Sequence, residues 1–110
     1  MFAEIATLDE FRELVELEPA VLAYFSTGEC QICQVLKPKV EGMMADCFPK
    51  IRTIYVDSGE APEVAAQNRI FAAPTILVFF EGKEYLRKSR SFGIDELKNE
   101  INRAYSLLFS

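Results

Sequence analysis

The feature that most constrains this chain is a short apolar run, residues 21–25, which is followed five positions later by the first of two cysteines, Cys30 and Cys33. A continuous apolar run of this length is typical of a strand that is buried on both faces of a sheet. Apolar residues then recur at helical spacing, which predicts a helix over residues 30–47. The two cysteines are therefore predicted to open a helix that directly follows a buried strand.

Helical and strand patterns alternate along the rest of the chain. Thr7 and Glu10 have the spacing of a capping box, which begins a helix. The predicted helices cover residues 8–18, 30–47, 62–68 and 94–108, and the predicted strands cover residues 21–25, 51–56, 75–80 and 84–89, with residues 2–6 as a further candidate. Strands joined through helices pair in parallel, whereas the last two strands are close enough to form an antiparallel hairpin. We expect one α/β domain over residues 1–110, with a mixed central sheet of four to five strands flanked by helices on both faces.

Composition excludes several classes of active site. The chain has no histidine, so a Ser-His-Asp triad, a Cys-His protease pair and a histidine-ligated metal site are all excluded. It has 17 acidic and 12 basic residues, for a net charge of -5. This acidic balance argues against nucleic acid and anionic membranes as partners.

The hydropathy pattern bears on where the protein acts. The longest uncharged stretch, residues 70–80, contains Pro74 and is far shorter than the roughly 18 apolar residues of a spanning helix. Glu4 and Asp9 lie where a secretory signal would carry its apolar run. We therefore expect a cytoplasmic protein with no membrane association.

The cysteine pair is the strongest chemical signal. Two intervening residues in a first helical turn let the sulfurs of Cys30 and Cys33 approach disulfide distance. The free N–H groups and partial positive charge of a helix N-terminus favour a thiolate on the outer cysteine, Cys30. Cys33, one turn inside, would be shielded and would resolve a mixed disulfide. This pattern favours redox chemistry.

Two other interpretations of the pair stay open. It could be a chance pair of buried cysteines, or it could contribute to a zinc site. A closed zinc site needs about four ligands, and this chain offers one further cysteine, Cys47. Cys47 itself falls on the apolar helical face with Leu36, Val40 and Met43, which predicts a buried core thiol, although a third redox cysteine is the alternative.

The chain resembles the thioredoxin family over nearly its whole length. Four features match in order and spacing: the strand at residues 21–25, the pair Cys30 and Cys33, Pro38 five residues after the second cysteine, and the segment Ala73-Pro74-Thr75 before a strand. The turn Glu81-Gly82-Lys83 and Gly93 before the last helix also fit. The resemblance implies a thioredoxin-like fold and a thiol-disulfide oxidoreductase.

What the resemblance implies can be assigned residue by residue. Cys30 would be the nucleophile and Cys33 the resolving cysteine. Pro74 would be the family's cis-proline, facing the disulfide, and the backbone of Ala73 would pair with the bound substrate. Phe92 and Gly93 would lie on the same groove, as the resemblance also implies. The substrates would be protein disulfides, the reductant a thioredoxin reductase or a small thiol, and no bound cofactor would be needed.

The departures from the family carry information about the site. Glu29 replaces the usual tryptophan, and Gln31 and Ile32 replace the usual Gly-Pro. Tyr24 occupies the position of a buried aspartate, and Thr53 that of its partner lysine. The charge of Glu29 should oppose thiolate formation on the adjacent cysteine. We therefore predict a reduction potential different from that of typical thioredoxins, where ~30 mV already changes the two-electron equilibrium tenfold.

Two alternatives from other classes stay open, and the departures favour the first of them. The chain could be a thioredoxin-fold module that binds peptides in the Pro74 groove with little redox turnover. A weaker alternative is a metal bridged between two chains, each contributing Cys30 and Cys33. A disulfide reduction assay and metal analysis would separate these possibilities from the oxidoreductase.

Overall fold

The computed structural model describes residues 2–28, 30–89 and 92–109. Its elements follow the predicted order and lie close to the predicted bounds. They are β1 (Ala3–Glu4), α1 (Leu8–Leu17), β2 (Ala20–Ser26), α2 (Gln31–Cys47), β3 (Arg52–Asp57), α3 (Pro62–Gln67), β4 (Thr75–Phe80), β5 (Lys83–Ser89) and α4 (Ile94–Phe109). The candidate strand near the N-terminus is confirmed as β1, a short strand of two residues.

The strands form one mixed sheet in the order β1-β3-β2-β4-β5. Strands β1 and β2 both run parallel to β3, while β4 runs antiparallel to β2 and β5. In this register Tyr24 of β2 lies between Tyr55 of β3 and Ile76 of β4. The prediction of parallel early strands and a closing antiparallel hairpin is confirmed, and β2 is the central strand that leads to the cysteines.

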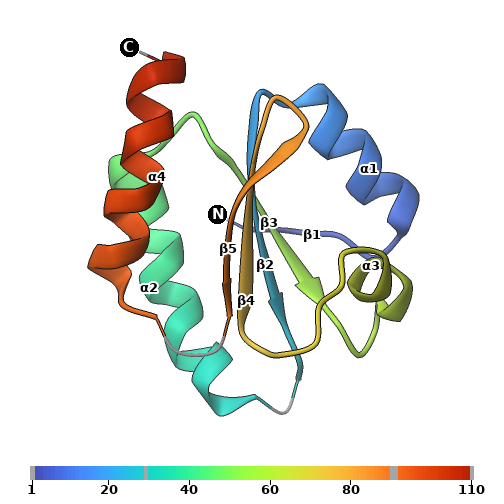
Figure 1. Cartoon of the computed structure of the whole chain (residues 1–110). Coiled ribbons are helices and arrows are strands. Elements are labelled where there is room, and N and C mark those ends of the chain that lie inside the picture. The colour runs from blue at the N-terminus through green and yellow to red at the C-terminus, as the bar shows by residue number, and fades with distance from the viewer. Residues whose placement is uncertain (1, 29, 90–91, 110) are drawn as a thin grey trace.

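Helices cover both faces of the sheet, with α2 and α4 on one side and α1 and α3 on the other (Figure 1). Every residue of β2 is buried, so its alternate side chains serve two separate cores. Tyr24 packs in the core that includes Val40 of α2 and Leu97 of α4. Phe25 packs in the core that includes Phe11 of α1. The apolar run therefore forms a strand because both of its faces are covered.

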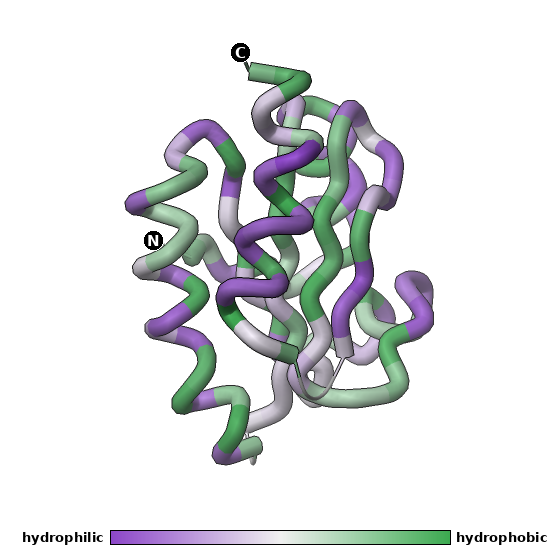
Figure 2. The backbone as a smooth tube through the Cα atoms, turned by 60° about the vertical axis from the view of Figure 1, so that its left-hand side comes forward, coloured by the Kyte–Doolittle hydropathy of each residue, from purple (hydrophilic) through white to green (hydrophobic). Residues whose placement is uncertain are grey.

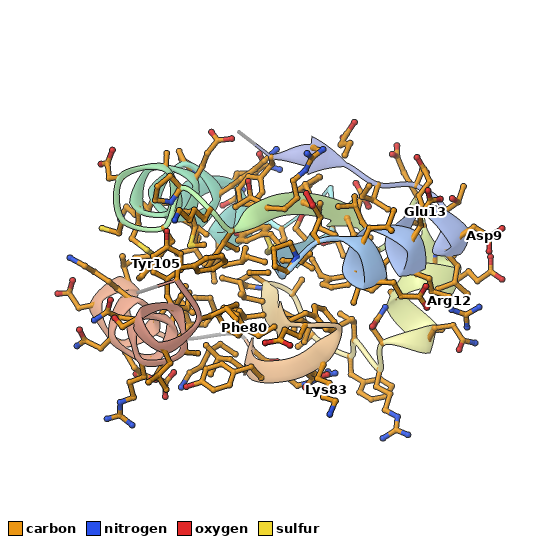
Figure 3. All side chains as sticks on the ribbon, turned by 90° about the horizontal axis from the view of Figure 1, so that it is seen from above. Asp9, Arg12, Glu13, Phe80, Lys83 and Tyr105 are labelled. Carbon is orange, nitrogen blue, oxygen red and sulfur yellow. A yellow bond between two sulfur atoms is a disulfide. The ribbon has the colours of Figure 1, made fainter. Side chains whose placement is uncertain are left out.

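The helices are amphipathic and turn their apolar sides toward the sheet. Figure 2 shows the central strands in green, with purple and green alternating along the helices that pack on them. Seen from above in Figure 3, the side chains of Asp9 and Arg12 extend outward from α1. The sequence periodicity that predicted the helices is thus the periodicity of their burial.

The buried side of α2 differs in part from the predicted one. The fully buried residues of this helix are Cys33, Val40 and Met44, while Met43 and Cys47 are half-buried and flank them. The predicted face therefore does pack against the core, but the most deeply buried line of the helix is displaced from it toward Cys33 and Met44. The prediction that Cys47 is a buried core thiol is accordingly corrected: it is a free, half-buried thiol packed against the edge of the core.

Within residues 2–28, 30–89 and 92–109, none of the helices is both long and apolar enough to cross a bilayer.

Candidate active site

Cys30 and Cys33 form a disulfide at the start of α2, with their Cα atoms 5.2 Å apart. Cys30 is the N-cap residue, and its Sγ accepts a hydrogen bond of 3.2 Å from the backbone N–H of Cys33. Cys33 is 1% exposed, whereas Cys30 is half-buried. The sequence-based expectation of an outer and an inner sulfur agrees with this geometry.

The backbone around Cys30 places the sulfurs at the helix start. The N–H of Cys30 donates to the carbonyl of Thr27, which closes the loop after β2, and the N–H of Gln34 donates to the carbonyl of Cys30. The first turn of α2 contains no acidic side chain. The partial positive charge of this helix end is therefore available to a thiolate on Cys30.

The loop before β4 lies beside the cysteines. The peptide bond between Ala73 and Pro74 is cis, and Pro74 is buried. Thr75, the first residue of β4, donates from its hydroxyl to the carbonyl of Ala72 and lies opposite Phe25 of β2. Because β2 ends one residue later and leads to Cys30, this pairing brings the proline loop to the cysteine end of the sheet.

A groove of about 630 Å³ runs between the start of α2 and this loop. Its lining is largely apolar and comprises Ile32, Leu36, Phe71, Ala72, Ala73, Pro74 and Phe92. Three of the four predicted substrate-binding residues, Ala73, Pro74 and Phe92, are thus brought together, next to the predicted modulating residue Ile32. Gly93 is not among the lining residues. It is exposed, and its carbonyl accepts the N–H of Leu97 at the start of α4.

Phe71 is a groove residue that the sequence interpretation missed. Its side chain is 89% exposed, an unusual state for a large apolar residue, and it lines two adjoining hollows. The signal available in the sequence was a phenylalanine in the loop close to the Ala73-Pro74 segment. An exposed aromatic residue beside a reactive pair marks a candidate contact surface.

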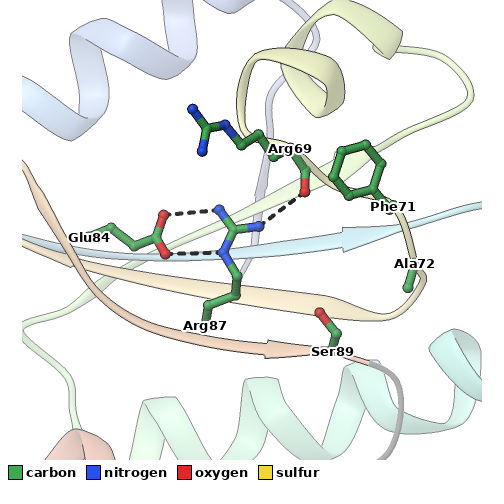
Figure 4. Close-up of a pocket in the computed structure, with 6 residues that line it drawn as sticks. All are labelled: Arg69, Phe71, Ala72, Glu84, Arg87 and Ser89. Carbon is green, nitrogen blue, oxygen red and sulfur yellow. Dashed lines mark hydrogen bonds and ion pairs between the residues drawn. The ribbon is translucent and has the colours of Figure 1, made fainter.

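The second hollow that Phe71 lines is also lined by Glu84 and Arg87, which form an ion pair (Figure 4). The Arg87 guanidinium makes paired hydrogen bonds to the carboxylate of Glu84 and also donates to the backbone carbonyls of Asn68 and Arg69. These bonds tie β5 to the end of α3. Arg87 therefore supports the loop that carries Phe71.

Beneath the disulfide, Tyr24 is fully buried. Its hydroxyl donates a hydrogen bond of 2.8 Å to the backbone carbonyl of Cys33. Burial raises the pKa of this hydroxyl above its ordinary range, and the neighbouring Tyr55 raises it further. Tyr24 is consequently a neutral donor at the position that a buried aspartate occupies in the family that the sequence resembles.

A second tyrosine completes the layer under the cysteines. The Tyr55 ring stacks on Tyr24, with centroids 6.1 Å apart and an interplanar angle of 19°, and its hydroxyl is hydrogen-bonded to Ser26. The Nζ atom of Lys37 lies 3.9 Å from the Tyr55 ring centroid. Neither Tyr55 nor Lys37 was singled out from the sequence, although parallel pairing of the two strands places the tyrosines side by side.

The remaining predicted modulating residues divide into two cases. Gln31 is exposed on the first turn of α2, beside the groove residue Ile32. Glu29 lies outside the described residues, so its predicted effect on Cys30 stays a prediction. Within the described part of the chain, no group of three or more cysteine and acidic side chains is arranged to hold a metal ion.

Comparisons with known proteins agree on one family. The family model described as thioredoxin matches residues 3–103. Thioredoxin-like protein YdfQ of Bacillus subtilis is 30% identical over 84 residues, which cover 76% of this chain and 74% of that protein. Thioredoxin-1 of Saccharomyces cerevisiae is 29% identical over 84 residues, covering 76% of this chain and 81% of that protein. The X-ray structure of Fasciola hepatica thioredoxin has a TM-score of 0.83 at 28% identity and covers 94% of this chain and 98% of that one.

Proposed function

The chain belongs to the thioredoxin family and is a thiol-disulfide oxidoreductase, and from this premise we propose that it exchanges disulfides with protein substrates. One observation carries the proposal: Cys30 and Cys33 form a disulfide at the first turn of α2, with the inner sulfur shielded behind the outer one. This arrangement separates the two roles that exchange requires. Cys30 attacks the substrate disulfide, and Cys33 then displaces the substrate from the mixed disulfide.

In the reducing direction the exchange takes two steps. The Cys30 thiolate attacks one sulfur of the substrate disulfide, so that a mixed disulfide forms and the other substrate sulfur leaves as a thiolate. The Cys33 thiolate then attacks Sγ of Cys30, which forms the Cys30–Cys33 disulfide and releases the second substrate thiolate. Two electrons pass to the substrate, and the two dithiol protons end on its thiols.

We assign substrate binding to the apolar groove beside the cysteines. The backbone of Ala73, next to the cis bond to Pro74, is the proposed hydrogen-bonding partner of an extended substrate segment. The exposed side chains of Ile32 and Phe71, together with Phe92, offer apolar contact on either side of that segment. Burying such side chains against substrate would favour binding by the hydrophobic effect.

The oxidised pair must be reduced again for turnover. We propose a thioredoxin reductase or a small thiol as the electron donor, in line with the family. No bound cofactor is needed in this scheme, because Cys30 and Cys33 carry both electrons. A reducing compartment would sustain it, and we propose the cytoplasm as the location. Cell fractionation with detection of the native chain tests this location.

We also propose that the reduction potential of the pair differs from that of typical thioredoxins, because Gln31 and Ile32 separate the cysteines and Glu29 precedes them. Equilibration of the pair with glutathione buffers, followed by thiol trapping, measures this potential. A value indistinguishable from that of a typical thioredoxin contradicts this part of the proposal.

The decisive experiment is reduction of insulin disulfides with dithiothreitol as the electron donor. Wild type should accelerate the reduction, and Cys30→Ser should abolish the acceleration, because the attacking thiolate is lost. Cys47→Ser is the matched control and should retain full activity, since this thiol lies at the far end of α2. If wild type is as inert as Cys30→Ser, a peptide-binding module with the same groove replaces the oxidoreductase.

A further inference from the structure

We propose that Tyr24 is the positioning residue of this dithiol: by holding the Cys33 carbonyl, its hydroxyl keeps the Cys33 N–H directed at Sγ of Cys30. This inference rests on the proposed function, because it concerns the reactivity of the attacking sulfur. Tyr24 does not touch the substrate or the reacting sulfurs in this role. It acts through the first turn of α2.

The contacts form a continuous path from the sheet to the outer sulfur. The Tyr24 hydroxyl donates to the Cys33 carbonyl at 2.8 Å, and the Cys33 N–H donates to Sγ of Cys30 at 3.2 Å. The next peptide N–H, that of Gln34, donates to the Cys30 carbonyl at 3.3 Å. Residue Cys33 is therefore held at its carbonyl from β2 while its N–H faces the sulfur. A donor on that carbonyl also polarises the peptide group that binds back to Cys30.

The tyrosine is well placed to fix a backbone carbonyl. Its side chain is fully buried, and its ring is stacked on Tyr55 and lies 5.6 Å, centroid to centroid, from Phe2. Tyr55 is itself held by its hydrogen bond to Ser26 and by Lys37 over its ring. A fully buried and closely packed side chain has little freedom to move. The Tyr24 hydroxyl therefore fixes the position of the Cys33 carbonyl oxygen.

The expected consequence is a thiolate on Cys30 that is stabilised by a well-aligned N–H donor. Hydrogen bonds to the charged form of a group favour that form. Because burial raises the pKa of the Tyr24 hydroxyl, this group stays a donor and does not take up the Cys33 proton. Tyr24 thus replaces the acid of the family with a neutral support whose effect is on geometry.

The test compares Tyr24→Phe with wild type by the rate at which reduced Cys30 reacts with iodoacetamide between pH 5 and 10, in a Cys47→Ser background. We expect Tyr24→Phe to slow alkylation at pH 7 by about threefold to tenfold, the worth of one weakened hydrogen bond to the thiolate. The two rates should converge at high pH, where the thiol is ionised in both proteins. A merely structural loss of packing would not shift this profile along the pH axis.

Two further variants serve as matched controls. Tyr55→Phe removes a hydroxyl from the same buried stack but leaves the Cys33 carbonyl bonded to Tyr24, and Tyr85→Phe removes a hydroxyl that donates to the Glu100 carbonyl, remote from the cysteines. Tyr85→Phe should match wild type, and Tyr55→Phe should change the profile less than Tyr24→Phe. Equal changes in Tyr24→Phe and Tyr55→Phe overturn the inference, as does a Tyr24→Phe profile identical to that of wild type.

A measurement on the unaltered protein covers the case in which Tyr24→Phe fails to fold. In the reduced wild type, the Tyr24 hydroxyl proton should exchange slowly in NMR spectra and show a nuclear Overhauser effect to the amide of Gln34. Exchange as fast as that of the Tyr85 hydroxyl contradicts the inference. Insulin turnover by wild type is scored separately, so a failure of the proposed function is distinguishable from a failure of this role for Tyr24.

Discussion

Sγ of Cys30 accepts a hydrogen bond from the backbone N–H of Cys33, three residues further along the chain. This contact joins the two members of the reactive pair through the backbone as well as through sulfur. In the reduced protein the same N–H would face the thiolate of the attacking cysteine. We therefore expect loss of the Cys30 sulfur and loss of the Cys33 sulfur to block different steps of disulfide exchange.

Replacing the inner cysteine should trap the reaction halfway. In Cys33→Ser, Cys30 can still attack a substrate disulfide, but no sulfur remains to displace the substrate from it. A mixed disulfide between Cys30 and insulin chains should accumulate and be visible by mass spectrometry under non-reducing conditions. Cys30→Ser should form no such adduct, and an adduct formed through Cys33 in that variant would reverse the assigned roles.

Phe71 should contribute to binding of protein substrates. Its exposed ring lines the groove, so Phe71→Ala should raise KM for insulin by about threefold to tenfold through lost apolar contact, with little change in kcat. The reduction potential should not move. Leu107→Ala removes an equally exposed apolar side chain from the last turn of α4, which ends at the opposite end of the molecule from the start of α2 (Figure 1). An unchanged KM in Phe71→Ala, or an equal rise in Leu107→Ala, would count against the groove.

Tyr24 should make the fold sensitive to alkaline pH. Below pH ~10 the hydroxyl is protonated in both folded and unfolded chains. Above it the unfolded chain loses the proton while burial keeps it on the folded one, so the free energy of unfolding falls by up to about 1.4 kcal/mol per pH unit. Urea unfolding at pH 8, 10 and 11 should show wild type losing more stability than Tyr24→Phe.

The comparison of these two proteins removes other alkaline effects. The pKa of Lys88 is also raised, first by its hydrogen bond to Glu96 and then by that to Glu100, and its contribution is likewise lost at high pH. Because Lys88 is present in both proteins, its effect cancels in the difference between them. Parallel stability curves for the two proteins would show that Tyr24 does not titrate as its burial requires.

The capping box of α1 should matter for stability and not for redox chemistry. The N–H of Glu10 donates to Oγ1 of Thr7, and the N–H of Thr7 donates to the Glu10 carboxylate, both at 3.2 Å. Thr7→Ala should lower the free energy of unfolding by about 1 kcal/mol. Thr7→Ser, which keeps the hydroxyl, should stay close to wild type, and insulin reduction at 25 °C should be unchanged in both. A loss of stability in Thr7→Ser as large as that in Thr7→Ala would contradict the capping role.

Much of the fold could be predicted from local pattern. Alternation of helical and apolar segments placed the helices and strands of the described residues within a few residues, and chain order alone indicated parallel pairing followed by a hairpin. These predictions succeed because burial of a periodic apolar face is decided within each segment. The side of α2 that faces the sheet was placed less well, since apolar residues such as Met43 and Cys47 flank the buried line of Cys33, Val40 and Met44.

The chemistry of the reactive pair could also be predicted from the sequence. The placement of the two cysteines in one helical turn after a buried strand depends only on residues that are close along the chain. The sequence by itself determined the α/β order, the position of Cys30 and Cys33 at a helix start, and the absence of histidine chemistry. Only the tertiary structure decided that Phe71 and Phe92 line the same groove as Ile32. It also decided that the Tyr24 hydroxyl donates to the Cys33 carbonyl while the Tyr24 ring stacks on Tyr55. Those contacts join separate strands, loops and helices, so they depend on sheet register and on how α2 seats over β2, which no local pattern specifies.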